Sequence, residues 1–146
     1  MLPKDRFKLI PAVHLFLIKD DKMLFGLRQN TGYEDGKFHL IAGHSDGGET
    51  ISKAMIREAK EETGITIKPK DLKFAHIMHR LGDTHERLDF FFVCKKWQGT
   101  PKVCEPDKCA ELKWFSPKKL PKNIIPYVRF VLKRVNKKIL YSEYGW

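Results

Sequence analysis

The chain has 146 residues and a formal net charge of +10, from 28 Lys and Arg against 18 Asp and Glu. This length suits one domain, residues 1–146, which can bury roughly two thirds of its unfolded surface without disulfides or a structural metal. A content of 42% hydrophobic residues excludes intrinsic disorder. Apolar runs such as Val13 to Ile18 fall far short of the ~18 residues of a membrane span, so we expect no membrane partner.

The amino-terminal segment and the cysteines indicate the compartment. Met1 to Phe7 contains no apolar core followed by a small-residue cleavage site, so we expect no secretory signal. Cys94, Cys104 and Cys109 are odd in number and form no C-x-x-C pair, which favours reduced thiols over a disulfide framework or a zinc site. The expected location is therefore cytoplasmic.

The charge is distributed unevenly along the chain. An isoelectric point near 9.6 suggests an acidic partner, although a basic surface can also serve solubility alone. Ser116 to Trp146 contains eight basic residues and one acidic residue, a net charge of +7. Gly43 to Ile65 contains three basic and five acidic residues, a net charge of −2. An acidic segment thus lies within a basic chain.

The first forty residues predict strands. Phe7 to Lys19 is rich in Val, Leu, Ile and Phe, and Asp20-Asp21 marks a turn into Met23 to Leu27, which together predict a β-hairpin. The polar segment Asn30 to Gly36 has two glycines and predicts a loop. A short apolar piece, Phe38 to Ala42, follows it.

The remaining segments predict an α/β domain. Thr50 to Thr63 is expected to be helical, with Thr50 as its N-cap and Gly64 as a left-handed stop. Further strands are expected at Leu72 to His79, Leu88 to Lys95 and Leu112 to Phe115. The final helix is expected at Tyr127 to Leu140, where one apolar stripe contains Val128, Val131, Leu132, Val135 and Ile139. Strands on both sides of a central helix indicate a mixed β-sheet packed between helices.

The helix that begins after Thr50 has an unusual distribution of charge. At about 100° per residue, Ala54, Met55 and Ala59 define its apolar side. The carboxylates of Glu58, Glu61 and Glu62 fall on or beside that same side, whereas Lys53 and Lys60 lie opposite. Placing like charges against a core is costly, because each carboxylate needs water or a partner. A divalent cation such as Mg²⁺ or Mn²⁺ resolves this conflict, although a solvated Glu-rich face is the ordinary alternative.

Residues 43–65 read GHSDGGETISKAMIREAKEETGI. This segment resembles the signature of the Nudix hydrolases, G-x5-E-x7-R-E-U-x-E-E-x-G-U with U aliphatic, and every position matches if Ala59 is counted as a small aliphatic residue. The order of strands and helices on both sides is also similar to the Nudix α/β/α sandwich. The resemblance therefore extends through most of the chain.

The resemblance implies roles for residues of the signature. Glu58, Glu61 and Glu62 would bind Mg²⁺ or Mn²⁺, or position and deprotonate a water molecule, and the backbone carbonyl of Ala42 would be a further metal ligand. Glu49 and Arg57 would form a supporting pair that orients these carboxylates. The implied reaction is attack of water on a phosphoanhydride that links a nucleoside diphosphate to another group.

Two residues outside the signature are candidates for binding the substrate. Arg28 has a spacing that resembles that of an arginine contacting the nucleotide in MutT-like members, although a surface role is the alternative. Asn123 resembles an asparagine that recognises the base in those members, and its amide can both donate and accept.

The resemblance also implies a further glutamate from a downstream loop, and His44 within the signature is one more candidate. Glu105 is expected to serve as an additional general base or ligand, ahead of Glu86 and Glu111. His44 is expected either to touch phosphate or to cap its loop.

The resemblance leaves the substrate open. A proline typical of ADP-ribose pyrophosphatases is replaced by Arg80 and Leu81, and a tyrosine typical of dinucleoside polyphosphate hydrolases by Gly82 and Asp83. The default is a MutT-like enzyme that converts a nucleoside triphosphate to a monophosphate and pyrophosphate. ADP-ribose, dinucleoside polyphosphates and RNA 5′ ends remain alternatives, as does a non-catalytic nucleotide-binding module.

RNA is the less favoured partner. Arg129, Lys133 and Lys137 have the spacing to follow phosphates along the final helix, but aromatic residues are not clearly interleaved with them. A solvated helix face explains these charges more simply. The oligomeric state is expected to be a monomer or a homodimer, the latter through exposed sheet edges.

Overall fold

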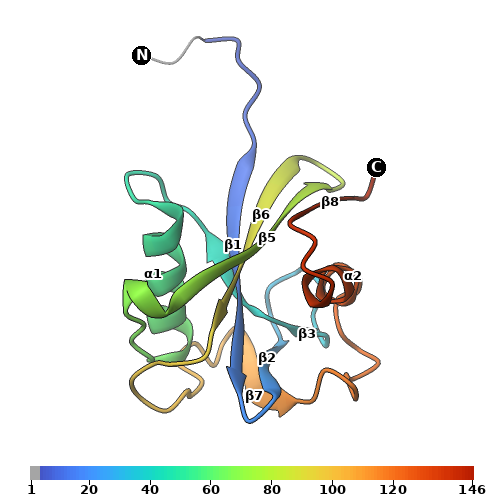
Figure 1. Cartoon of the computed structure of the whole chain (residues 1–146). Helices are drawn as coiled ribbons and strands as arrows, with labels where there is room; N and C mark the ends of the chain where they lie inside the picture. Colours follow the sequence, from blue (N-terminus) through green and yellow to red (C-terminus); the bar gives the residue numbers. More distant parts are fainter. Residues whose placement is uncertain (1–3) are drawn as a thin grey trace.

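The computed structural model describes residues 4–146 (Figure 1). The first three residues of the segment in which we expect no secretory signal lie outside the described residues. The elements in chain order are β1 (Ile10–Lys19), β2 (Lys22–Arg28), β3 (Phe38–His39), β4 (Ile41–His44), α1 (Ile51–Thr63), a 3-10 turn (Pro69–Asp71), β5 (Leu72–Leu81), β6 (Glu86–Cys94), β7 (Cys109–Phe115), α2 (Pro126–Asn136) and β8 (Tyr141–Tyr144).

The ten-residue strand β1 organises the sheet. It pairs in parallel with β6 along one edge. On the other edge, its first half pairs with β4 and its last residues pair with β2, both antiparallel. Antiparallel β5 then follows β6, and parallel β8 follows β5, so the sheet is mixed as predicted. Because β2 and β4 use different parts of the same edge of β1, the sheet opens between them.

The two helices cover opposite sides of the sheet (Figure 1). Alternate residues of a strand point to opposite faces. Val13 and Leu15 of β1 therefore pack with Met55 of α1 in one hydrophobic cluster. Phe16 of the same strand packs with Val128 of α2 in the other cluster. This arrangement confirms the predicted α/β/α sandwich.

The end of the chain differs from the prediction. The final helix begins at Pro126 and ends at Asn136, rather than reaching Leu140. Lys138 has a φ of 58°, and Ile139 is 42% exposed instead of continuing the apolar stripe. The following strand, β8, was not predicted. Its pairing partner β5 lies about sixty residues earlier in the chain, so no local pattern announces it.

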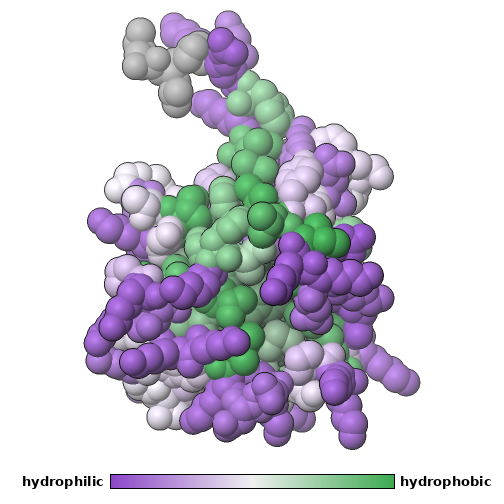
Figure 2. Space-filling view, in the orientation of Figure 1, coloured by the Kyte–Doolittle hydropathy of each residue, from purple (hydrophilic) through white to green (hydrophobic). Residues whose placement is uncertain are grey.

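Several strand boundaries differ from the predicted ones by a few residues. The strand predicted at Leu112 to Phe115 begins at Cys109, and β5 and β6 extend toward one another across a short hairpin. Hydrophilic side chains cover most of the face shown in Figure 2, with apolar residues gathered down its middle. Within residues 4–146, neither helix is long and apolar enough to cross a membrane.

Candidate active site

Helix α1 has the boundaries that the sequence predicts. The Thr50 hydroxyl accepts a hydrogen bond from the Lys53 N–H at 3.2 Å, which satisfies one free donor of the first turn. Gly64 ends the helix with a φ of 79°, and its N–H donates to the Lys60 carbonyl. These two caps fix where the helix begins and ends, and the packing of Ala54, Met55 and Ala59 on the sheet sets the direction of its carboxylates.

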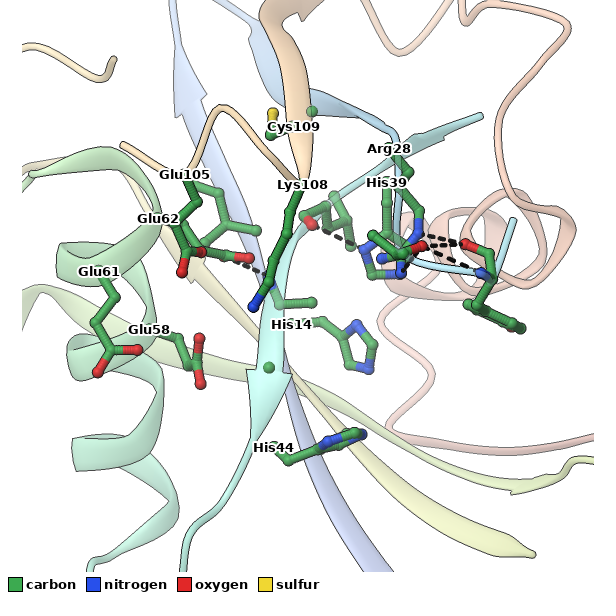
Figure 3. Close-up of a pocket in the computed structure, with 18 of the residues that line it drawn as sticks. His14, Arg28, His39, His44, Glu58, Glu61, Glu62, Glu105, Lys108 and Cys109 are labelled. Atoms are coloured by element: carbon green, nitrogen blue, oxygen red, sulfur yellow. Dashed lines mark hydrogen bonds between the residues drawn. The ribbon is translucent and has the colours of Figure 1, made fainter. Parts of the chain in front are cut away.

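A cavity of about 660 Å³ lies between α1, the divergent strands β2 and β4, and the segment that precedes β7 (Figure 3). Its size falls in the range of small-molecule sites. Its ionisable lining residues include Arg28, Asp46, Glu58, Glu61, Glu62, Arg87, Glu105, Lys108 and three histidines, at positions 14, 39 and 44.

The three carboxylates of α1 reach this cavity to different depths. Glu58 is 15% exposed and Glu62 is partly buried, whereas Glu61 is 50% exposed at the rim. The prediction that all three carboxylates face inward therefore holds fully only for Glu58 and Glu62. Burial raises the pKa of Glu58, although its bond to Arg57 opposes this effect. Burial, followed by repulsion from Glu58, raises the pKa of Glu62 well above its ordinary value, despite a 3.0 Å hydrogen bond from the Ala42 N–H.

Gly43 on β4 lies directly against Glu58. A Cβ built at Gly43 would overlap the carboxylate carbon and both carboxylate oxygens of Glu58. Only a residue without a side chain allows this close approach. The first glycine of the signature thus lets α1 place a carboxylate beside the backbone of β4.

The Arg57 guanidinium connects the beginning and the end of the signature. It donates to both oxygens of Glu49, at 3.1 Å from Nε and 2.8 Å from Nη2. Its Nη1 donates to Glu58 at 3.0 Å and to Glu61 at 3.2 Å. The hydrogen bond from Arg57 lowers the pKa of Glu49. Arg57 also donates to the His44 carbonyl at 3.1 Å, so one planar group fixes the loop and the helix together.

The donor set fits a divalent cation. Glu58, Glu61, Glu62 and the Ala42 carbonyl offer oxygen donors, which Mg²⁺ and Mn²⁺ prefer. Within residues 4–146 no three acidic, histidine or cysteine side chains already surround a common point for an ion. The positive group between Glu58 and Glu61 is the Arg57 guanidinium.

Arg28 and Glu105 also line the cavity, with Glu105 beside Glu62 and Arg28 on the far side from α1 (Figure 3). Arg28 donates to the Tyr33 carbonyl at 2.8 Å and to the Thr31 hydroxyl at 3.1 Å. Of the three downstream acids considered from the sequence, only Glu105 lines the cavity. Glu86 instead accepts a hydrogen bond from His79 at 2.8 Å.

Two other predicted residues have different outcomes. His44 lines the cavity, and its Nε2 lies 3.5 Å from Nη1 of Arg87. Burial, and then the charge of Arg87, lower the pKa of this histidine. Asn123 is not among the residues that line the cavity, and its amide donates to the Gly36 carbonyl at 3.0 Å. The structure thus gives no support to a base-reading Asn123, because its turn directs the amide to the 30–36 loop.

The sequence did not predict a group of buried polar side chains that line the cavity, namely His14, His39 and Tyr127. His39 donates through Nδ1 to the Leu40 carbonyl at 2.8 Å, so its Nε2 accepts from the Tyr127 hydroxyl. His14 donates through Nε2 to Asp89 at 2.9 Å, and its Nδ1 is buried without a partner among the described residues. His14 interrupts an apolar strand, which was the one available signal.

A buried ion pair between Arg80 and Asp89 contacts His14 and Tyr127. Arg80 donates to both oxygens of Asp89, at 2.7 and 3.1 Å, and its guanidinium carbon lies 4.1 Å from the centre of the Tyr127 ring. Burial alone would raise the pKa of Asp89, but the bonds from His14 and Arg80 hold it far below its ordinary range. Asp89 is therefore a fixed negative charge that positions His14.

Known proteins resemble the chain in sequence. A family model described as the NUDIX domain matches residues 8–134. The ADP-ribose pyrophosphatase of Methanocaldococcus jannaschii is 33% identical over 123 residues, which are 83% of this chain and 71% of that protein. The NAD-capped RNA hydrolase NudC of Shigella flexneri is 26% identical over 114 residues, 78% of this chain but only 42% of that protein. The chain thus spans less than half of that second relative.

Solved structures share the fold. A MutT NUDIX hydrolase from Burkholderia pseudomallei superposes with a TM-score of 0.81 at 23% identity, covering 88% of this chain and 99% of that one. The MutT protein from Methanosarcina mazei superposes with a TM-score of 0.77 at 20% identity, covering 89% and 94%. Since the family model spans most of the residues that build both the sandwich and the cavity, this chain belongs to the Nudix hydrolases.

Proposed function

We propose that this enzyme uses a divalent metal to hydrolyse the phosphoanhydride of a nucleoside diphosphate derivative. The observation that carries the proposal is the cavity that Glu58, Glu61 and Glu62 of α1 line together with Glu105 and Arg28. The side with the four glutamates is suited to cations, and the side with Arg28 can hold an anionic nucleotide. Nudix hydrolases generally use divalent metals, and we propose Mg²⁺ or Mn²⁺ here.

Each residue has a proposed task in this reaction. Glu58, Glu61 and Glu62 would hold the metal together with the Ala42 carbonyl, and a bound metal would neutralise phosphate oxygens and acidify water. The remaining tasks belong to the chain itself. Arg57 and Glu49 keep the carboxylate of Glu58 in place through the hydrogen bonds described above.

Residues outside α1 would bind the substrate and transfer the proton. Glu105 would accept the proton of the attacking water, and Arg28 would bind the nucleotide. His44 would contact a phosphate from the rim of the cavity. Asn123 has no task in this proposal, because it does not line the cavity.

Two substrates head the tests. A nucleoside triphosphate, split into a monophosphate and pyrophosphate, agrees with the absence of the other subclass hallmarks after the signature. ADP-ribose is the second candidate, and the 33% identity with an archaeal ADP-ribose pyrophosphatase favours it. RNA ends and dinucleoside polyphosphates are tested alongside them, and the cytoplasmic location and the monomeric or dimeric state stay predictions.

The decisive experiment is a substrate panel with Mg²⁺ or Mn²⁺, with products identified by mass in ¹⁸O-labelled water. It contains nucleoside triphosphates, ADP-ribose, dinucleoside polyphosphates, nucleotide sugars and capped RNA. We expect turnover that requires the metal and is lost in Glu62→Gln. Nucleotide binding without any turnover would instead support a non-catalytic binding module.

A companion variant separates the proton acceptor from the metal ligands. We expect Glu105→Gln to lower turnover by about 10²- to 10⁴-fold, the usual contribution of a general base, while metal affinity stays near that of the wild type. A parallel loss of metal affinity would make Glu105 a ligand instead.

A further inference from the structure

The segment 105–109 is joined firmly to the end of β2. The Gln29 N–H donates to the Lys108 carbonyl at 3.0 Å, and the Gln29 side chain donates to the Pro106 carbonyl at 2.6 Å. The Asn30 side chain adds a bond to the Asp107 carbonyl at 3.2 Å. These bonds hold the segment beside the end of β2, and the Cys104 N–H ties its start to the Glu62 carbonyl of α1 at 3.2 Å.

Within this segment, a turn directs two side chains toward the cavity. The Glu105 carbonyl accepts from the N–H groups of both Lys108 and Cys109, each at 3.0 Å. Both Glu105 and Lys108 line the cavity as a result. Glu105, the proposed proton acceptor, and Lys108 thus belong to one segment of four consecutive residues.

The side chain of Lys108 extends into the cavity. In Figure 3 its amino group lies between the carboxylates of α1 and the ring of His14. The ion pairs found among residues 4–146 do not include Lys108, although four glutamates line the same cavity. Its ammonium group is therefore available to an anion.

We propose that Lys108 binds the phosphate that carries the nucleoside, an inference that rests on the proposed function. The carboxylates of α1 repel a phosphate that approaches them, and the ammonium group of Lys108 beside them offsets that repulsion. Lys108 lies on the Arg28 side of the carboxylates, where the nucleotide would bind. An ammonium group is a compact charge with three donors, which suits non-bridging phosphate oxygens.

This position also links substrate binding to proton transfer. Because Lys108 and Glu105 belong to one hydrogen-bonded turn, a phosphate bound by Lys108 would lie at a defined position relative to Glu105, the proposed proton acceptor. Lys108 is thus a binding residue that fixes the distance between the phosphate and Glu105.

The test measures binding of products, so it does not depend on turnover. The full chain with Mg²⁺ is titrated with the four common nucleoside 5′-monophosphates and, separately, with the four nucleosides, by calorimetry and ligand-observed NMR. Lys108→Met is compared with Lys108→Arg. The matched control is Lys113→Met, because Lys113 carries the same charge on β7 but covers the Phe115 ring and does not line the cavity.

For the monophosphate that binds best, we expect Lys108→Met to weaken affinity about tenfold, as the loss of one charged hydrogen bond predicts. Lys108→Arg should restore much of that affinity. Nucleoside affinity should not change, and Lys113→Met should behave as the wild type does.

Other outcomes overturn the inference in distinguishable ways. Wild-type affinity of Lys108→Met for the monophosphate removes the role of Lys108 but leaves the proposed function intact. An equal loss of nucleoside affinity, or an equal effect of Lys113→Met, shows a structural or long-range effect instead of a phosphate contact. If the wild type binds no monophosphate, the nucleotide cavity itself is wrong, and the proposed function fails with the inference.

Discussion

Gly43 and Glu58 come from different elements, yet the carboxylate of Glu58 occupies the space where a Cβ of residue 43 would lie. Strand β4 and helix α1 approach one another at this point because the strand presents no side chain there. The glycine of the signature and its first helical glutamate are therefore parts of one contact.

Gly43→Ala tests this contact. The clash falls on the flexible end of Glu58, so we expect a small change in the melting temperature but a loss of turnover of about tenfold or more, because Glu58 must move. Turnover and thermal unfolding are measured on the same preparation. In a Glu58→Gln background, Gly43→Ala should add little further loss, and full additivity would contradict an effect through Glu58.

Glu62→Gln should change how the stability of the metal-free protein depends on pH. The pKa of Glu62 is raised well above the ordinary value of 4.5 in the folded state. The folded state then holds its proton where the unfolded state has lost it, so this stabilisation is complete below pH 4.5 and is lost as pH rises through the folded pKa. We expect the variant to remove that loss.

Urea unfolding with a chelator, followed from acidic to neutral pH, measures this effect. Glu111→Gln is the control, because Glu111 is an exposed glutamate of β7. If Glu62→Gln and Glu111→Gln give parallel curves, burial of Glu62 does not control the pH dependence.

Arg57→Lys should separate charge from geometry. Lysine keeps the positive charge but cannot donate at once to Glu49, Glu58 and the His44 carbonyl, as the guanidinium does. We expect turnover to fall about tenfold or more with little change in thermal stability. A double-mutant cycle with Glu49→Gln should show strong coupling in turnover, whereas independent effects would show that Glu49 is not the partner through which Arg57 acts.

Asp89→Asn should destabilise the protein strongly. Asp89 is fully buried, and its loss of charge leaves the buried Arg80 guanidinium without compensation. Breaking one side of such a pair costs about 3–5 kcal/mol in the free energy of unfolding. The matched control is Glu86→Gln, which breaks the partly exposed pair with His79 and should cost less than about 1 kcal/mol. Equal costs in urea unfolding would show that burial does not strengthen the Asp89 pair.

The local sequence was sufficient for the helix that contains the carboxylates. Its caps at Thr50 and Gly64 and the phase of its apolar residues depend on neighbours within one or two turns, so they were predictable. The phase was less accurate at its edge, where Glu61 lies half exposed at the rim. A helical projection gives the direction of a side chain but not how much of it other segments of the chain cover.

Short-range periodicity predicted the strands and helices of the sandwich and the acidic face of α1, and the signature-like residues 43–65 indicated the family. The tertiary structure was needed to place Glu105 and Lys108 in the cavity beside the α1 carboxylates, to place Asn123 outside its lining, and to pair β8 with β5. It also joined His14 to Asp89 across seventy-five positions of the chain. Contacts between distant segments depend on how the sheet closes, and no local pattern specifies that closure.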